Sequence, residues 1–153
     1  MIRVIDIRER TELMSEAVDY FWKNWGEDSN FHFYRDCIEQ SCKAGSDLPR
    51  FYLAMRDEQI IGSYALLRSE LNSRQDLSPW IACLYVEPAE RGKQIGALLQ
   101  EHAVQQTKEI GYSRLYLGTD LTGYYERTNW KHIGFGYQLD NEQTRVYAYE
   151  IED

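Results

Sequence analysis

The segment 80–118 constrains the fold more than any other part of the chain. It opens with Trp80-Ile-Ala-Cys-Leu-Tyr-Val86, an apolar run typical of a strand buried on both faces. A predicted helix follows, with one apolar stripe and an end at Gly111, and its stripe contains Ile95, Leu98, Leu99, Ala103 and Ile110. A further strand is predicted at 113–117. This order predicts a parallel β-α-β unit inside a mixed sheet.

Hydrophobic periodicity predicts the elements on either side of this unit. Alternating or apolar runs predict strands at 2–7, 51–56, 60–68, 132–138 and 144–151. Helical spacing predicts a helix from an N-cap at Thr11 to a stop at Gly26, a second helix from Ser29 or Asn30 to before Gly45, and a short helix at 124–128. The polar segment 69–79 is expected to be a loop. The sequence therefore predicts one α/β domain covering 1–153.

Length and composition support a globular domain without metal or disulfide support. The chain has 153 residues, of which 43% are hydrophobic and 27% charged. Its three cysteines (Cys37, Cys42 and Cys83) lack the spacing of a disulfide framework or a zinc site. We expect a cytoplasmic protein, because free thiols suit a reducing compartment and the charged, alternating N-terminus is unlike a signal peptide.

The charge of the chain excludes some classes of partner. The formal net charge is −8, so a phosphate backbone or an anionic membrane surface would be repelled, whereas a cationic small molecule would be attracted. We therefore expect neither nucleic-acid nor membrane binding. No apolar run approaches the roughly 20 residues that a membrane-spanning helix needs.

The segment 84–96 is the part of the chain that predicts a functional site. A strand ends at Val86, and a turn with Arg91, Gly92 and Lys93 then leads into the helix. Such a turn presents backbone N–H groups at the positive end of a helix, which favours a phosphate or pyrophosphate ligand. The segment does not match a P-loop, because Gln94 follows Gly92-Lys93 and Glu87 stands where the first glycine belongs. The dinucleotide-binding GxGxxG pattern is absent too.

The same segment resembles the pyrophosphate loop of the GNAT superfamily of N-acetyltransferases, whose pattern is [Arg/Gln]-x-x-Gly-x-[Gly/Ala]. Arg91 and Gly96 match this pattern, while Gln94 replaces the middle glycine. A second element, Tyr124-Tyr-Glu-Arg-Thr-Asn-Trp130, resembles the aromatic-Tyr-x-x-x-Gly-aromatic element of that superfamily. Asn129 replaces its glycine, and asparagine is the next-best residue for a left-handed helix end.

The resemblance implies a fold and an activity. The implied fold is a mixed, mostly antiparallel sheet of about seven strands with helices on both faces. The implied activity is transfer of an acetyl group from acetyl-coenzyme A (acetyl-CoA) to a primary amine, on a small cation or a peptide, by direct attack in a ternary complex. Neither a metal nor a nucleic-acid partner is implied, and a homodimer remains open.

The resemblance also implies roles for particular residues. The strand residues that would line the pantetheine arm and receive the thioester carbonyl are Leu84, Tyr85 and Val86. The residues that would hold the pyrophosphate are Arg91, Gly92, Lys93, Gln94, Ile95 and Gly96. Tyr125 would assist the departing thiolate. A phenol with a pKa near ~10 is a weaker acid than a thiol near ~8.5, so we expect Tyr125 to donate a hydrogen bond to the thiolate instead of transferring its proton.

Several interpretations stay open at this stage. Residues 80–86 contain no carboxylate, and none of Glu27, Asp28, Glu70 and Asp120 is assigned as a general base. The aromatic-acidic stretch 21–34 is a candidate acceptor wall, although Phe21, Trp22 and Trp25 fall on the core stripe of their helix. His102 and Cys83 are interpreted as packing residues. A non-catalytic acyl-coenzyme A sensor or an interaction module on the same fold remains the alternative function.

Overall fold

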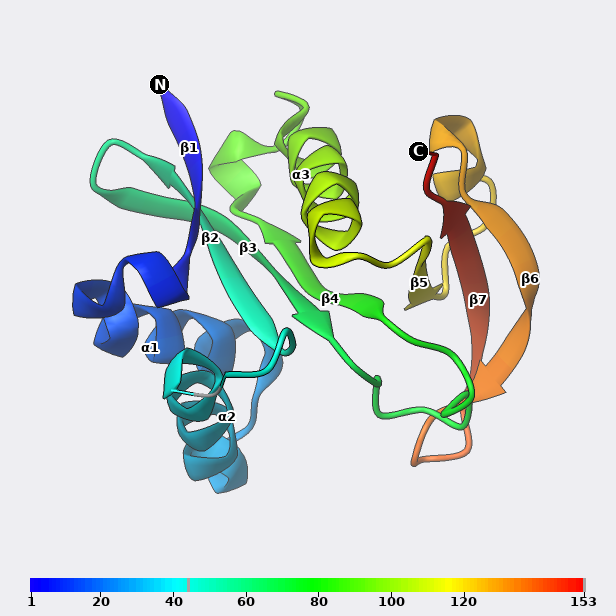
Figure 1. Cartoon of the computed structure of the whole chain (residues 1–153), viewed down its shortest axis with the longest axis horizontal. Coiled ribbons are helices and arrows are strands. Elements are labelled where there is room, and N and C mark those ends of the chain that lie inside the picture. The colour runs from blue at the N-terminus through cyan, green and yellow to red at the C-terminus, as the bar shows by residue number, and fades with distance from the viewer. Residues whose placement is uncertain (44, 153) are drawn as a thin grey trace. The chain divides into compact units, whose positions relative to one another are not determined.

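The computed structural model describes residues 1–43 and 45–152 (Figure 1). Seven strands form one mixed sheet in the order β1-β2-β3-β4-β5-β7-β6. Their bounds are β1 Ile2–Asp6, β2 Arg50–Arg56, β3 Gln59–Leu67, β4 Trp80–Val86, β5 Arg114–Thr119, β6 Lys131–Tyr137 and β7 Gln143–Glu150. The α-helices are α1 Met14–Trp25, α2 Phe31–Lys43 and α3 Ile95–Ile110. The predicted seven-stranded, mixed α/β sheet is therefore confirmed.

The parallel pairing inside the β-α-β unit is the one that the sequence predicts. β4 and β5 pair in parallel, with Trp80 opposite Tyr116, as the β-α-β unit requires. The other pairings of known register, β1 with β2, β5 with β7 and β6 with β7, are antiparallel. The helix between the parallel strands ends at Gly111, whose φ of +112° suits glycine and confirms the predicted stop.

The chain divides into two compact units. The first contains residues 1–65 and 83–102, and the second contains 66–82 and the chain from 103 onward. In the first unit, α1 and α2 pack against each other and α2 packs against β2 (Figure 1). Buried Phe21 meets Phe51 edge to face at 5.2 Å, and Tyr52 stacks on Tyr64 at 4.4 Å. These four rings are part of the buried core of this unit.

The second unit has a core of its own. Trp80, Tyr116, Val146 and Ala148 are buried together, and Leu77 packs against them. The segment 69–79, expected to be only a loop, also forms ordered contacts there. Asn72 bridges to Gln138, and the Ser73 N–H donates to the Tyr137 carbonyl at 2.8 Å. These bonds cover part of the edge of β6, which would otherwise present unpaired backbone groups.

The predicted N-cap at Thr11 is wrong. Residues Thr11–Leu13 form a separate 3-10 turn, and α1 begins at Met14. The side chain of the actual N-cap residue, Leu13, makes no capping hydrogen bond. An ion pair of 2.7 Å between Arg10 and Glu12 lies within the turn that precedes the helix. Helix α2 is described to Lys43, so the predicted end before Gly45 falls at residue 44, outside the described residues.

Candidate functional site

The second half of β4 departs from the expected burial. Trp80–Ala82 is buried, but Cys83, Leu84, Tyr85 and Val86 are only half-buried. The change coincides with Cys83, whose φ of +55° lies in the left-handed region and interrupts the regular strand. The expectation of a strand buried on both faces is therefore wrong for these four residues. Leu84–Val86, the predicted pantetheine-lining residues, keep side-chain surface that a ligand can cover.

The turn from Arg91 to Gly96 has two left-handed residues, Gly92 at φ +79° and Gln94 at φ +64°. Gln94 therefore adopts a conformation that glycine adopts most easily, at a cost of about 1 kcal/mol. Its carbonyl accepts the Leu98 N–H at 3.1 Å, which starts the hydrogen bonding of α3. The departure from the expected glycine is thus accommodated by strain.

The turn leads into the N-terminus of α3, where several backbone N–H groups can donate to a ligand. The first N–H that bonds back along α3 is that of Leu98, so the N–H groups of Ile95, Gly96 and Ala97 have no partner within the helix. Ile95 is buried and anchors the turn, while residues 91–94 are exposed. A Cβ atom at Gly96 would lie 4.0 Å from Val86 Cγ2, an ordinary contact distance. The six predicted pyrophosphate residues therefore form one continuous turn with an exposed surface.

Cations around the turn are held by specific neighbours. The Arg91 Nε donates to the Val86 carbonyl at 3.0 Å, and its guanidinium lies 5.6 Å from the centroid of the Tyr85 ring. Glu90 Oε1 accepts a hydrogen bond from the Arg56 Nη2 at 2.7 Å. The same oxygen forms an ion pair with the Lys93 Nζ at 3.6 Å. The hydrogen bond from Arg56 holds the pKa of Glu90 below its usual value. No motif or spacing in the sequence indicated Arg56, which lies on β2.

The second predicted element lies in the second unit. Tyr125–Thr128 forms the 3-10 helix η5, and Asn129 ends it with φ +75°, the left-handed conformation predicted for that position. The half-buried ring of Tyr125 contacts the rings of Tyr124, Trp130 and Tyr147. Burial, the larger cause, and the charge of Tyr124 raise the pKa of Tyr125 to about 12.

A hydrogen bond ties η5 to β7 next to Tyr125. The Tyr147 hydroxyl donates to the Glu126 carboxylate at 2.8 Å and accepts from the Arg145 Nε at 3.3 Å. For the Tyr125 hydroxyl itself, no hydrogen-bond partner exists within residues 1–43 and 45–152. This hydroxyl is therefore available to a ligand.

The acids considered as general bases differ in their surroundings. Glu27, Asp28 and Asp120 are exposed. Glu70 is half-buried, and burial raises its pKa. Glu70 thus has an environment that moves a carboxyl group toward neutral pH.

The aromatic stretch 21–34 divides between core and surface. Phe21 is buried and Trp22 half-buried, with the Trp22 Nε1 donating to the Glu27 carbonyl at 2.7 Å. Trp25, expected in the core, is 43% exposed because it lies in the last turn of α1 before Gly26. His102 is half-buried, with its Nδ1 2.7 Å from the Tyr64 hydroxyl, in agreement with a packing role.

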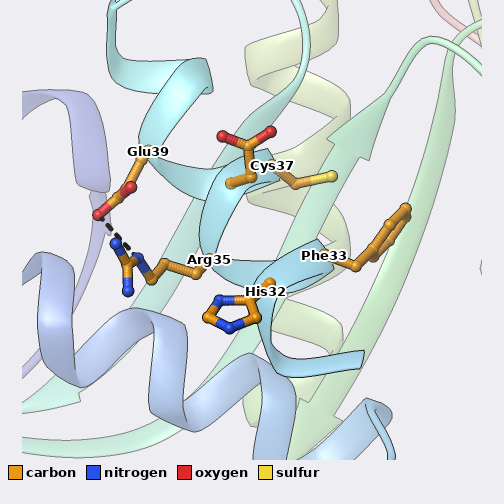
Figure 2. A pocket seen from close by; sticks show the side chains of 6 residues that line it. His32, Phe33, Arg35, Cys37 and Glu39 are labelled. Carbon is orange, nitrogen blue, oxygen red and sulfur yellow. Dashed lines mark ion pairs between the residues drawn. The ribbon is translucent and has the colours of Figure 1, made fainter. Parts of the chain in front are cut away.

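A surface hollow lies on α2 (Figure 2). Phe33 and Cys37 point to one side of this helix, and Arg35 and Glu39 form an ion pair of 3.6 Å on the other. The lining side chains all come from this one helix: His32, Phe33, Arg35, Asp36, Cys37 and Glu39. Burial raises the pKa of the Cys37 thiol, so it is a poor nucleophile. We assign this hollow no role in the chemistry.

Within 1–43 and 45–152, no cluster of three or more His, Cys, Asp and Glu side chains has the arrangement of a metal site. In the same part of the chain, every helix is too short or too polar to cross a membrane.

Comparison with known proteins identifies the family of the chain. The sequence profile of the Acetyltransferase (GNAT) family matches residues 11–135, so the chain belongs to that family. No curated protein sequence matches it.

Solved structures of low sequence identity share the fold over nearly the whole chain. One is a GNAT-family protein from Desulfovibrio desulfuricans (TM-score 0.72, 13% identity, covering 99% of this chain and 100% of that one). Another is an aminoglycoside 6'-N-acetyltransferase complexed with coenzyme A (TM-score 0.71, 16% identity, covering 100% of this chain and 98% of that one). A third is a GNAT-family acetyltransferase from Elizabethkingia anophelis with acetyl-CoA bound (TM-score 0.66, 16% identity, covering 97% of this chain and 97% of that one).

Proposed function

We propose that this protein is an acetyl-CoA-dependent N-acetyltransferase that acetylates a primary amine by direct attack in a ternary complex. The observation that carries the proposal is the turn Arg91–Gly96, where two left-handed residues direct a helix N-terminus and two cations to one exposed surface. The family profile spans residues of both compact units, which supports treating 1–153 as one acetyltransferase domain. Three free cysteines fit a cytoplasmic location.

The residues of the turn and of β4 fit coenzyme A. Backbone N–H groups of residues 92–96, with Arg91 and Lys93, would bind the pyrophosphate. Leu84, Tyr85 and Val86, half-buried in the structure, would line the pantetheine arm. The thioester of the bound cosubstrate supplies an activated acetyl group.

Tyr125 is proposed to stabilise the leaving thiolate by a hydrogen bond. With a pKa of about 12 against ~8.5 for a thiol, full proton transfer from Tyr125 would be uphill by about 5 kcal/mol. A phenol that keeps its proton is still an effective donor to a developing negative charge. The raised pKa therefore favours a hydrogen-bonding role over that of a proton donor.

The acceptor is proposed to be a small cationic amine or a basic peptide amine. The net charge of −8 attracts cations, while the turn itself is locally basic and admits an anionic cosubstrate. The likeness to a fold whose solved members include an aminoglycoside 6'-N-acetyltransferase supports this substrate class. Neutral or acidic amines would gain nothing from the field of the protein.

Salt should slow the capture of such an acceptor. Raising ionic strength from 10 to 300 mM should lower kcat/KM for the amine about tenfold, because the attraction is screened within ~8 Å at physiological salt. kcat should change much less. The measurement uses saturating acetyl-CoA, since salt also weakens anion binding at the turn. A best acceptor that is anionic, or a rate that does not respond to salt, would contradict the charge argument.

The pH profile should show no loss of activity from ionisation of Tyr125 below about pH 11. Burial penalises the phenolate, so the neutral donor persists well above the ordinary tyrosine pKa of ~10. Meanwhile kcat/KM for an alkylamine should rise toward pH 10 as the ammonium loses its proton. Initial rates between pH 7 and 10.5 test this. A decline near pH 9–10 that disappears in Tyr125→Phe would contradict it.

One screen tests the proposed function directly. Acetyl-CoA should raise the melting temperature of the wild-type chain, and free thiol should be released when amines of several classes are added. No stabilisation by millimolar acetyl-CoA would refute the proposal. Binding without turnover would favour the alternative, a non-catalytic acyl-coenzyme A sensor, which the lack of a carboxylate in 80–86 keeps open.

A further inference from the structure

A hydrogen bond connects α1 to the residue that follows β4. The Tyr20 hydroxyl donates to the Glu87 carboxylate at 2.5 Å, and both side chains are half-buried. Burial and the Glu87 charge raise the pKa of Tyr20, so the phenol remains the donor at any physiological pH. The Glu87 N–H also donates to the Ile61 carbonyl on β3 at 2.9 Å. Glu87 is therefore held through both its backbone and its side chain.

The same tyrosine contacts the residue that supports Arg91. The Tyr20 and Tyr85 rings meet edge to face, with centroids 6.2 Å apart. The Arg91 guanidinium lies 5.6 Å from the Tyr85 centroid, within the range of a cation–π interaction. Although Arg91 is exposed, its side chain is thus held by the Tyr85 ring and by its bond to the Val86 carbonyl.

The alternation of the extended chain explains why one tyrosine reaches two residues. Side chains two positions apart lie on the same side of a strand, and Tyr20 contacts both Tyr85 and Glu87. Val86 lies between them in sequence, and its Cγ2 is the atom nearest to a Cβ placed on Gly96 of α3. Tyr85 and Glu87 therefore face α1, whereas Val86 faces the start of α3.

We propose that Tyr20 is a positioning residue for coenzyme A: its bond to Glu87 fixes the Tyr85 ring against Arg91 and so places the guanidinium for the phosphate groups. This inference rests on the proposed function. The proposed role of the Tyr20–Glu87 bond differs from that of a simple helix-to-sheet contact, because the bond affects only the part of the ligand that Arg91 binds. The affinity for ligands without phosphate should not change when the Tyr20 hydroxyl is removed.

The test measures binding and kinetics in Tyr20→Phe, which keeps the ring and removes the donor. We expect Kd and KM for acetyl-CoA to rise about tenfold, as for loss of a hydrogen bond to a charged group, with kcat nearly unchanged. KM for S-acetylpantetheine, which lacks the pyrophosphate, should stay the same. In an Arg91→Ala background, Tyr20→Phe should have no further effect on acetyl-CoA binding.

Two variants of Glu87 form a matched pair, because glutamine and alanine both remove the negative charge and differ in whether an acceptor for Tyr20 remains. Glu87→Gln keeps an oxygen that accepts from Tyr20 and should retain more affinity than Glu87→Ala, which does not. Unchanged acetyl-CoA affinity in Tyr20→Phe would overturn the inference. So would an equal loss with S-acetylpantetheine, or a full additional loss in the Arg91→Ala background. A wild-type chain that binds no acetyl-CoA would overturn the proposed function and this inference together, whereas wild-type binding with an unaffected variant overturns only the inference.

Discussion

Gly96→Val should abolish the stabilisation of the folded chain by acetyl-CoA. In the wild type, ligand at 100 times its Kd should add about 2.7 kcal/mol to the free energy of unfolding, or about 5–10 °C in melting temperature for a chain of this size. Valine places branched methyl groups at the first turn of α3, where the pyrophosphate would approach the backbone. Differential scanning fluorimetry with and without ligand measures the effect.

Gly96→Ala is the matched control for this substitution. Its single Cβ would lie 4.0 Å from Val86 Cγ2, so it adds an ordinary contact and a better helix former. It should keep most of the ligand-induced shift, and both variants should melt close to the wild type without ligand. A full shift in Gly96→Val would contradict the assignment of the turn as the pyrophosphate site.

The β-α-β unit was predictable from sequence because its signals are local and agree with one another. An apolar run and an amphipathic stripe each specify one element and a terminal glycine specifies a helix end, and the structure has β4, α3 and the end at Gly111 where they were predicted. Burial follows the prediction less closely, since Leu98 of the stripe is 38% exposed. The start of α1 was less predictable. Thr11 has the side chain of an N-cap, but residues 7–13 form two consecutive 3-10 turns before the helix begins.

The candidate site shows the same division between local and long-range information. The left-handed conformations of Asn129 and Gln94 concern single residues. The conformation of Asn129 was predicted, and at Gln94 the family pattern has a glycine, the residue that adopts this conformation most easily. The bond between Tyr20 and Glu87 joins residues 67 apart in sequence, and Arg56 meets Glu90 across 34 residues. Such partners depend on which elements pack together, so hydrophobic periodicity could not have identified them.

Tyr125→Phe should lower kcat about 100-fold while leaving acetyl-CoA affinity almost unchanged. The substitution removes only the hydroxyl, and the proposed hydrogen bond strengthens as the thiolate forms in the transition state. Because this hydroxyl has no hydrogen-bond partner in the described chain (residues 1–43 and 45–152), its loss should not destabilise the protein. Steady-state kinetics at saturating amine, together with the melting temperature, measure both effects.

The neighbouring tyrosine makes this prediction specific. Tyr124 is 42% exposed, and the Arg127 guanidinium lies 4.9 Å from its ring centroid. Tyr124→Phe makes the same chemical change one residue away and should alter kcat less than twofold, roughly the effect of an exposed hydroxyl. If Tyr125 were only a packing residue, its phenylalanine variant would keep the ring contacts with Trp130 and Tyr147 and would resemble Tyr124→Phe. Equal, small losses in the two variants would therefore assign Tyr125 to the core, and a selective loss in Tyr125→Phe would assign its hydroxyl to the leaving group.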